Sequence, residues 1–572
     1  MLDVIKSFAY FAYLEAGIFG IMSREIFGTI LWLGNSQMDL KYYMEKLPLK
    51  KGSFIMVILN KTSRKLFEGK EEQMYISSRG NYQPVPASTA IRLGMVPEGG
   101  LFAPEEIPVL GKLKIQSMAG QSYGEVAQTI LEHFLDDFSP EEISDIIEKS
   151  YHQGNFDHPD IAPLVKLDRE TFILELWHGP TAAFKDMALQ IMPRLLTKSV
   201  EKTGSKEEVI IPVATSGDTG KAALEGFKNV PGVRVIVFYP DGGVSKVQEL
   251  QMTTAEGNNV AVVAVKGNFD DCQTGVKELF ADPELNRLLV SHNMVFSSAN
   301  SINWGRLLPQ IVYYFWAYAQ LLKQGEISWA DKINVVVPTG NFGNILACYY
   351  AYLMGLPVHK LICASNENKV LTDVINTGIY DRRRGFFKTI SPSMDILISS
   401  NFERFLFEVS RHNGAKITQW YRDLNEKGYF QVEEEYQKRW QGFLLGDFAS
   451  DWETMEVIKE TFQDKAYLLD PHTGVGVKVY RNYAQKTGDK TKTIVDATAN
   501  PYKFNKAVLE AIAGTEASEG KDEFAVLQEL HRRSGMPIHR ALKDLDQKKV
   551  KYKKVIEKDE IRDTVKEILD IK

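Results

Sequence analysis

The segment 178–190 (HGPTAAFKDMALQ) carries the clearest chemical signal in the sequence. Lys185 lies in its middle, preceded by Ala182, Ala183 and Phe184 and followed closely by further apolar residues. Lysines are rarely buried without a partner or a chemical task. Burial disfavours the ammonium form, so the neutral amine becomes available as a nucleophile. Such an amine condenses with carbonyl groups, including the aldehyde of pyridoxal phosphate. The local pattern alone leaves open a helix lysine whose stem crosses an apolar face.

Two glycine-rich stretches form a second group of candidate functional residues. Each follows a β-branched run and precedes a helical pattern: 214–220 (ATSGDTG) and 339–344 (TGNFGN). Backbone N–H groups at a helix N-terminus bind anions, and ligands collect at the carboxyl ends of parallel strands. Two such loops suggest two anionic groups, one on a cofactor and one on an acidic substrate, although each alone also fits a tight turn. The string 217–221 (GDTGK) lacks the glycine spacing of a nucleotide-binding loop, and Ala222 stands where that loop needs Ser or Thr.

The elements that must position these residues follow the pattern of a parallel α/β fold. Apolar runs typical of strands buried on both faces alternate with helical stretches, at 208–215, 234–239, 260–266, 294–298, 333–338, 360–364 and 493–497. Between 391 and about 463 such runs are absent, which predicts a helical insertion. Ahead of the core, 125–134 and 140–149 are predicted to be amphipathic helices, the second with Ser139 as its N-cap.

The chain is expected to contain several domains, because 572 residues are more than a single hydrophobic core usually includes. Changes in sequence character along the chain suggest where these parts begin and end. In residues 1–73, charged residues interrupt the apolar stretch 8–33, so no run reaches the roughly 20 residues of a membrane span. We expect that translation begins at Met74 and that 1–73 is an atypical extension. The remaining parts are a small N-terminal domain (74–168), a two-lobed core (169–510) and a C-terminal helical segment (511–572).

Composition narrows the class of protein. A net charge of −6 and a pI of about 6.0 do not suggest a nucleic-acid-binding surface. The three cysteines lack C-x-x-C spacing, which argues against a disulfide framework or a zinc site and favours a reducing compartment. No H-E-x-x-H motif occurs either. We therefore expect a cytoplasmic protein without a metal site, a nucleic-acid partner or a membrane partner.

Several motifs occur in the order typical of one enzyme family. They are ISSRGNY, GMVPEGGLF, HGPTAAFKD, ATSGDTG, VQELQMTT, NSINWGR, GNFGN and DPHTGVG. From Met74 to about Val508 the chain resembles the long-chain form of threonine synthase, and HGPTAAFKD is the most specific part of the match. The resemblance implies a pyridoxal-phosphate enzyme of the tryptophan-synthase-β type (fold type II). Its fold class would be α/β, with two doubly wound lobes and the cofactor between them.

The resemblance also implies roles for individual residues. Lys185 would carry the cofactor and later move protons, Thr498 would bond the pyridine nitrogen, and Asp218 would face the phenolic oxygen. The cofactor phosphate would be held by backbone N–H groups of Gly340, Asn341, Phe342, Gly343 and Asn344. The substrate carboxylate would be bound by Ser216, Gly217 and Thr219, and its phosphate by Asn300 and Arg306, a task that suits a planar guanidinium.

One position departs from the family pattern. The stretch 498–504 reads TANPYKF, with Asn500 where the family usually has His. Thr498 is retained, so the departure concerns only contacts around the site. His178 and His472 lie inside family motifs, and we expect structural roles for both.

The implied reaction converts O-phospho-L-homoserine and water to L-threonine and phosphate, the last step of threonine biosynthesis, by β,γ-replacement on pyridoxal phosphate. A related lyase that releases 2-oxobutyrate and ammonia without adding water remains open. So does a non-catalytic scaffold on the same fold. The expected partner is a small-molecule substrate, and the oligomeric state is left open between monomer and homodimer.

Overall fold

The computed structural model describes residues 72–215 and 217–572. The expectation about residues 1–73 therefore falls almost entirely outside the described residues, as does the assignment of Ser216. Residues 72–572 form one compact unit, and the following paragraphs concern that unit alone.

The N-terminal part combines a small antiparallel sheet with four helices. The sheet has the order β2–β1–β3, with β1 (Met74–Ser77), β2 (Val85–Pro86) and β3 (Phe102–Pro104). The helices are α5 (Ala87–Leu93), α6 (Lys112–Ser117), α7 (Tyr123–Leu131) and α8 (Pro140–Ser150), with the short turn η1 (Met118–Gly120). Both predicted helices are confirmed by α7 and α8. Ser139 caps α8 by accepting a hydrogen bond from the Glu142 amide, within a capping box.

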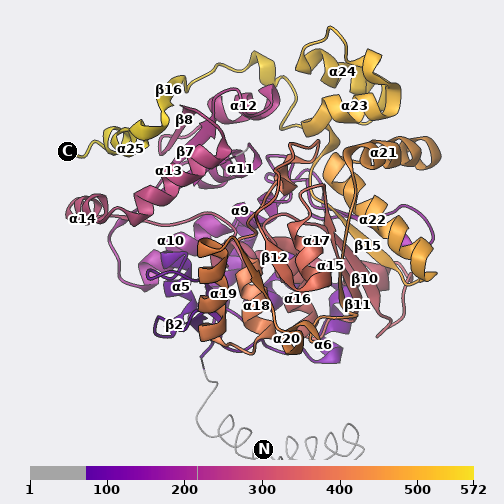
Figure 1. Ribbon diagram of the computed structural model, residues 1–572, viewed down its shortest axis with the longest axis horizontal. Coiled ribbons are helices and arrows are strands. Elements are labelled where there is room, and N and C mark those ends of the chain that lie inside the picture. The colour runs from indigo at the N-terminus through magenta and orange to yellow at the C-terminus, as the bar shows by residue number, and fades with distance from the viewer. Residues whose placement is uncertain (1–71, 216) are drawn as a thin grey trace, which may run out of the picture. The chain divides into compact units, whose positions relative to one another are not determined.

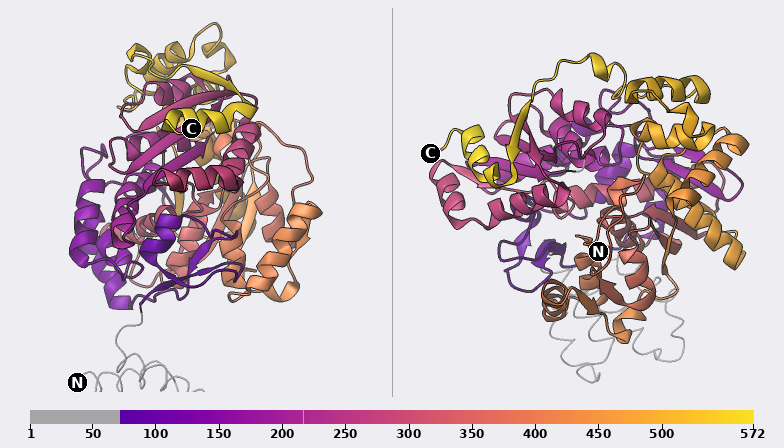
Figure 2. Two further views of the ribbon diagram at one scale, coloured as in Figure 1. Left: turned by 90° about the vertical axis from the view of Figure 1, so that its left-hand side faces the viewer. Right: turned by 45° about the horizontal axis from the view of Figure 1, so that its top comes forward.

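A five-stranded, all-parallel sheet forms the first lobe, in the order β16–β8–β7–β6–β9. Its strands are β6 (Glu208–Ala214), β7 (Val233–Pro240), β8 (Val260–Lys266), β9 (Met294–Phe296) and β16 (Lys554–Glu557). The associated helices are α10 (Met192–Lys202), α11 (Asp218–Phe227), α12 (Lys246–Thr253), α13 (Phe269–Ala281), α14 (Pro283–Ser291) and α25 (Ile561–Leu569). The C-terminal segment, expected to be helical, thus also supplies an edge strand, and Figure 2 shows β16 and α25 beside the strands of this lobe.

A six-stranded sheet forms the second lobe, in the order β14–β11–β10–β15–β5–β4, parallel except where β4 meets β5. Its strands are β4 (Leu164–Lys166), β5 (Thr171–Glu175), β10 (Ile333–Pro338), β11 (Val358–Ser365), β14 (Leu444–Phe448) and β15 (Thr493–Ala497). The helices are α9 (Asp186–Leu189), α15 (Trp304–Lys323), α16 (Gly343–Leu353), α17 (Val370–Thr377), α22 (Pro471–Thr487), α23 (Asn505–Ala513) and α24 (Glu523–Ser534), with the turns η3 (Pro501–Phe504), η4 (Thr515–Ala517) and η5 (Leu545–Gln547). The turn η6 (Lys558–Glu560) joins β16 to α25 in the first lobe. Each strand predicted from an apolar run is present in one of the two sheets, which confirms the α/β class (Figure 1).

The stretch 391–463 differs from the expected helical insertion, because it also contains strands. It holds η2 (Pro392–Met394), α18 (Phe402–Val409), α19 (Gly414–Glu426), α20 (Glu434–Gln437) and α21 (Asp451–Lys465). It also holds β13 (Tyr429–Gln431), which pairs with β12 (Ile379–Asp381), and β14, which adds to the six-stranded sheet. The expectation was wrong here because both strands are short and border an edge, so they carry no continuous apolar run.

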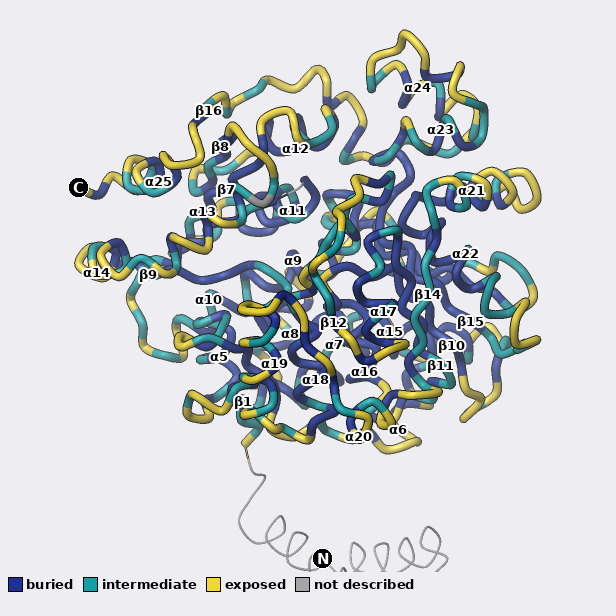
Figure 3. The backbone as a smooth tube through the Cα atoms, viewed as in Figure 1, coloured by how far each residue is buried: buried dark blue, intermediate teal, exposed yellow. Residues whose placement is uncertain are grey.

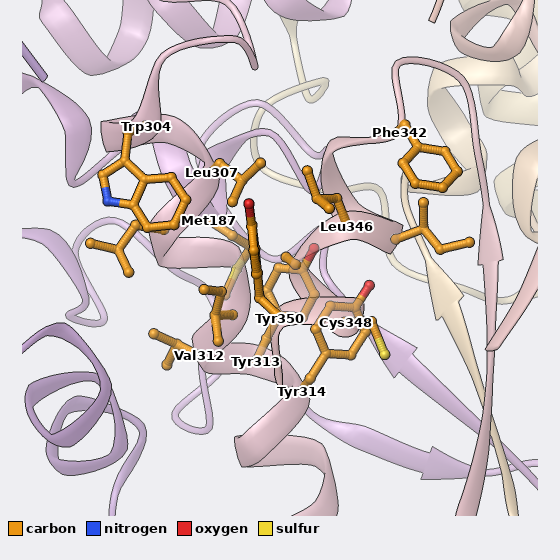
Figure 4. Packing of buried hydrophobic residues seen from close by; sticks show 14 of the residues in the cluster. Met187, Trp304, Leu307, Val312, Tyr313, Tyr314, Phe342, Leu346, Cys348 and Tyr350 are labelled. Atoms are coloured by element: carbon orange, nitrogen blue, oxygen red, sulfur yellow. The ribbon is translucent and has the colours of Figure 1, made fainter. Parts of the chain in front are cut away.

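The core of the second lobe lies around α15 and α16. Every residue of α15 from Trp304 to Leu321 is buried, and Figure 4 shows Tyr313 and Tyr314 of this helix packed near Cys348 and Tyr350 of α16. Figure 3 shows the same inner strands and helices as buried and the outer surface of α24 as exposed. The loops that leave β10 and β15 therefore start from a rigid, close-packed base.

Candidate active site

Lys185 lies at the start of α9, in a segment held by its own hydrogen bonds. The carboxylate of Asp186 accepts from the backbone N–H and the hydroxyl of Thr181, both at 2.8 Å, and Ala182 has a left-handed backbone with φ of 62°. Ala183 forms an antiparallel bridge with Ala499. These contacts bring the segment 178–190 against the loop after β15.

The bridge between Ala183 and Ala499 brings the backbone around Lys185 close to the backbone of Thr498. The amide of Phe184 donates to the carbonyl oxygen of Thr498 at 2.8 Å, and the Asn500 amide donates to Ala182 at 3.0 Å. Lys185 and Thr498 are 313 positions apart in sequence but are flanked by the same short ladder. Both side chains are buried.

The amine of Lys185 faces a buried carboxylate. Its Nζ lies 3.4 Å from Oδ2 of Asp218, and only 9% of its side chain is exposed. Burial lowers the pKa of Lys185, with Lys503 and Arg306 contributing by charge repulsion, while Asp218 acts in the opposite direction. A lysine stem crossing an apolar face toward solvent does not fit this environment, whereas a nucleophilic amine does.

Asp218 is shared between two lysines from distant parts of the chain. Its Oδ1 lies 2.8 Å from Nζ of Lys503 and accepts from Nε2 of Gln248 at 3.1 Å. Although burial opposes ionisation, Lys503 and Lys185 hold the pKa of Asp218 well below its usual range. The carboxylate is therefore ionised and bonded on both oxygens.

Lys503 was missed by the sequence analysis. It lies in the short turn η3, where Asn500 Oδ1 caps the turn by accepting from the Tyr502 amide at 3.1 Å. This contact gives Asn500, the departure from the family pattern, a structural task. The available signal was a lysine in otherwise apolar company at 501–504 (PYKF), close behind Thr498.

The loop 339–344 forms an anion cradle at the end of β10. Phe342 has a left-handed backbone with φ of 63°, and α16 starts at Gly343. In the described part of the chain, no acceptor bonds the backbone N–H groups of residues 340–344. A Cβ at Gly340 would lie 2.6 Å from the carbonyl oxygen of Ser393, so the close approach requires glycine. Free amides at a helix N-terminus suit a phosphate group.

The loop 214–220 is built differently. The hydroxyl oxygen of Thr215 accepts from the amides of Gly217 and Gly220, both at 2.9 Å. Gly217 has φ of 127°, and a Cβ there would lie 2.4 Å from Cδ of Gln248. Thr219 follows in the first turn of α11. The loop lies beside Asp218, but the binding of a substrate carboxylate by residues 216, 217 and 219 stays a prediction.

Arg306 is a buried cation without a carboxylate partner among the described residues. Its Nη1 donates to the carbonyl oxygen of Ala299 at 2.7 Å, and burial lowers its pKa to about 10. Asn300, the other predicted phosphate ligand, is partly buried in the turn before α15. Its backbone N–H donates to the hydroxyl oxygen of Ser298 at 3.2 Å. A buried, unneutralised guanidinium suits a phosphate group.

The two histidines of the family motifs are bonded within the protein. His178 lies between Asp157 at 2.6 Å and Glu175 at 2.9 Å. Burial opposes its charged form, but these carboxylates raise the pKa of His178. His472 Nε2 accepts from the Ser393 amide at 3.1 Å and so supports the loop that touches Gly340. These contacts agree with structural roles.

The donor set fits pyridoxal phosphate. Lys185 supplies an amine for its aldehyde, and residues 340–344 supply amides for its phosphate. Thr498 is joined to the Lys185 segment through Phe184, and it follows β15, the neighbour of the strand β10 that leads into loop 339–344. Within the described residues, no group of three or more His, Cys, Asp or Glu side chains is arranged to hold a metal ion. Those residues also include no helix long and apolar enough to cross a membrane.

Comparison with known families agrees with this geometry. Residues 74–151 match the family model described as threonine synthase N terminus, 157–420 match pyridoxal-phosphate dependent enzyme, and 473–567 match threonine synthase, C-terminal. The chain is a pyridoxal-phosphate-dependent enzyme of fold type II.

Individual relatives identify the family within this class of enzymes. The chain is 39% identical over 516 residues to threonine synthase-like 1 of Homo sapiens, covering 86% of this chain and 68% of the human protein. It is 38% identical over 468 residues to threonine synthase of Schizosaccharomyces pombe, covering 77% and 89% of the two chains. The crystal structure of PLP-bound threonine synthase from Brucella melitensis superposes with a TM-score of 0.75 at 36% identity, covering 86% of this chain and 99% of that one. The chain belongs to the threonine synthase family.

Proposed function

We propose that the protein is a threonine synthase that converts O-phospho-L-homoserine and water to L-threonine and phosphate. The observation that carries the proposal is the charge of the site. Three buried basic side chains lie at the site: Lys185 and Lys503 contact the carboxylate of Asp218, and Arg306 lies near enough to Lys185 to help lower its pKa. A buried surplus of positive charge is costly unless anions bind. A cofactor phosphate and a phosphorylated substrate supply those anions.

The cofactor would be held by the residues that lie at the site. Lys185 would join its aldehyde, the amides of residues 340–344 would bind its phosphate, and Thr498 would bond its ring nitrogen. When bound, pyridoxal phosphate supplies an electron sink for the substrate carbons.

The chain's own residues would then move protons and hold the leaving group. Lys185 Nζ would act as the base that takes the α-proton of the substrate, and its lowered pKa favours the neutral amine that this task needs. Arg306 would bind the substrate phosphate and stabilise its charge as it leaves. Asp218 would remain ionised and orient the lysine.

A lyase that releases phosphate, 2-oxobutyrate and ammonia is the second candidate. It shares every residue described above and differs only in omitting water addition at the β-carbon. The human relative is named threonine synthase-like 1 and not threonine synthase. The experiment below therefore also measures the products of the lyase reaction.

The test measures three products at once. Purified protein loaded with pyridoxal phosphate is incubated with O-phospho-L-homoserine, and phosphate, L-threonine and 2-oxobutyrate are quantified, with Lys185→Ala alongside. We expect equal phosphate and threonine, both absent in the variant. Phosphate matched by 2-oxobutyrate would establish the lyase, and a colourless, inactive protein would point to a scaffold. Turnover by Lys185→Ala near the parent rate would contradict the role of the lysine.

A further inference from the structure

Lys503 is completely buried, yet it reaches the centre of the site. Its side chain has 0% exposure, and Nζ lies 2.8 Å from Asp218 Oδ1. The same ammonium donates to the carbonyl oxygen of Thr181 at 3.0 Å and lies 3.4 Å from Oε1 of Gln251. All three partners lie at the site or in elements bordering it, so the ammonium is held from several sides.

The two lysines contact different oxygens of one carboxylate. Lys503 lies at 2.8 Å from Oδ1, whereas Lys185 lies at 3.4 Å from Oδ2. Lys503 is therefore the closer partner. A buried ion whose partner is removed is strongly destabilised. Whenever the nitrogen of Lys185 is neutral, Asp218 would be such an ion unless Lys503 remained beside it.

We propose that Lys503 is a positioning residue that acts as the permanent counter-ion of Asp218. It keeps the carboxylate ionised and directed at Lys185 while the nitrogen of Lys185 gains and loses a proton. This inference rests on the proposed role of Lys185 but does not depend on which product the enzyme releases.

The local structure around Lys503 holds its side chain in position beside Asp218. Asn500 caps the turn η3, and the Phe504 ring packs edge-on against His472 at 4.8 Å between ring centroids. The turn is thus fixed at both ends, and the four-carbon stem of Lys503 spans the distance to Asp218. A short polar side chain at this position could not reach the carboxylate.

The experiment follows the proton shared by Asp218 and the nitrogen of Lys185. The full-length protein is loaded with pyridoxal phosphate, and its visible absorption is titrated from about pH 6 to pH 10 without substrate. Lys503→Met removes the charge with little change in length, and Lys503→Arg retains it. Lys506→Met is the matched control, because Lys506 lies three residues further on with a side chain that is 71% exposed.

We expect Lys503→Met to raise the apparent pKa of the visible band by about one unit, a tenfold higher affinity for the shared proton. The reason is that loss of that proton would leave Asp218 as a lone buried anion. Lys503→Arg and Lys506→Met should titrate like the parent. An unchanged titration in Lys503→Met, or equal shifts in Lys503→Arg and Lys503→Met, would overturn the proposal.

Two further variants keep the test decisive if Lys503→Met does not fold. Asp218→Asn and Asp218→Asn with Lys503→Met are compared, since the double variant removes both members of the ion pair. Asp218→Asn leaves the Lys503 ammonium buried without its carboxylate, so the double variant should be the more stable of the two, with the higher Tm. A double variant no more stable than Asp218→Asn would contradict the inference. A parent protein without a visible band would overturn the roles of both lysines, whereas a band that Lys503→Met leaves unaltered would overturn only that of Lys503.

Discussion

In loop 339–344 the backbone N–H groups of residues 340–344 have no acceptor among the described residues, whereas in loop 214–220 the Thr215 hydroxyl accepts hydrogen bonds from the amides of Gly217 and Gly220. Both loops follow a parallel strand and lead into a helix, so both were expected to bind anions. The first is preorganised as a cradle, with Gly340 pressed against Ser393. The second is internally bonded, and its main contribution in this structure is to aim Asp218 at two lysines.

A buried tyrosine and a buried carboxylate support the first loop. Tyr314 Oη lies 2.9 Å from the carbonyl oxygen of Asn344 and 2.8 Å from Asp496 Oδ2. Burial raises the pKa of Asp496 to about 7. The comparison teaches that the first loop is held by residues outside it, which leaves its amides free, whereas the second is held partly by hydrogen bonds to its own Thr215. We therefore expect changes in the first loop to act on the cofactor and changes in the second to act on the substrate.

The largest effect is expected for Gly340→Ala. Its Cβ would lie 2.6 Å from a backbone oxygen, which cannot move as a flexible side chain does. Displacement of the loop would remove about two charge-assisted hydrogen bonds, each worth about 2 kcal/mol. The affinity for pyridoxal phosphate should fall about a thousandfold, measured by titration of the visible absorption. Retention of the parent affinity would mean that the phosphate binds elsewhere.

The buried support predicts a pH-dependent effect in Asp496→Asn. The folded pKa of about 7 lies above the unfolded value, so the native state binds the extra proton and its stability falls as pH rises toward 7. Asparagine mimics the protonated acid and removes this dependence. Relative to the parent, the variant should gain about 3 kcal/mol between pH 5 and pH 8, seen as a widening difference in Tm. A constant difference would show that Asp496 does not titrate in this range.

Gly217→Ala probes the second loop. The residue has φ of 127°, and its new Cβ would displace Gln248, which bonds to Asp218. We expect kcat/KM for O-phospho-L-homoserine to fall about thirtyfold, with cofactor affinity changed less than threefold. Steady-state kinetics and the same absorption titration measure the two quantities. A loss of cofactor affinity as large as that of Gly340→Ala would remove the distinction between the loops.

Thr215→Val is expected to have the smallest effect. It keeps the shape of the side chain but removes the oxygen that accepts from two amides. The two amides that lose this acceptor cost about 1 kcal/mol each, so the free energy of unfolding measured with denaturant should fall by about 2 kcal/mol. Cofactor affinity should stay near that of the parent, and Thr215→Ser should restore the stability.

Much of the fold could be predicted because its signals are local. The runs 333–338 and 493–497 match β10 and β15 to the residue, since strands buried on both faces are continuously apolar. Ser139 and Glu142 form the predicted helix start from four consecutive residues. Among the strands that escaped prediction, β14 and β16 are short edge strands whose pairing partners lie far along the chain. The inner strand β5 also escaped prediction, although all five of its residues are buried.

The sequence by itself determined the family motifs, the identity of Lys185 as the candidate nucleophile, and the glycines that let residues 340–344 approach an anion. Only the tertiary structure decided that Asp218 is shared by Lys185 and Lys503 and that Arg306 is buried without a carboxylate. Charge pairing depends on distances of a few ångströms between residues up to 285 positions apart, as in Lys503 and Asp218. No local pattern encodes such distances, because they arise only when the ends of β6 and β15 meet at one site.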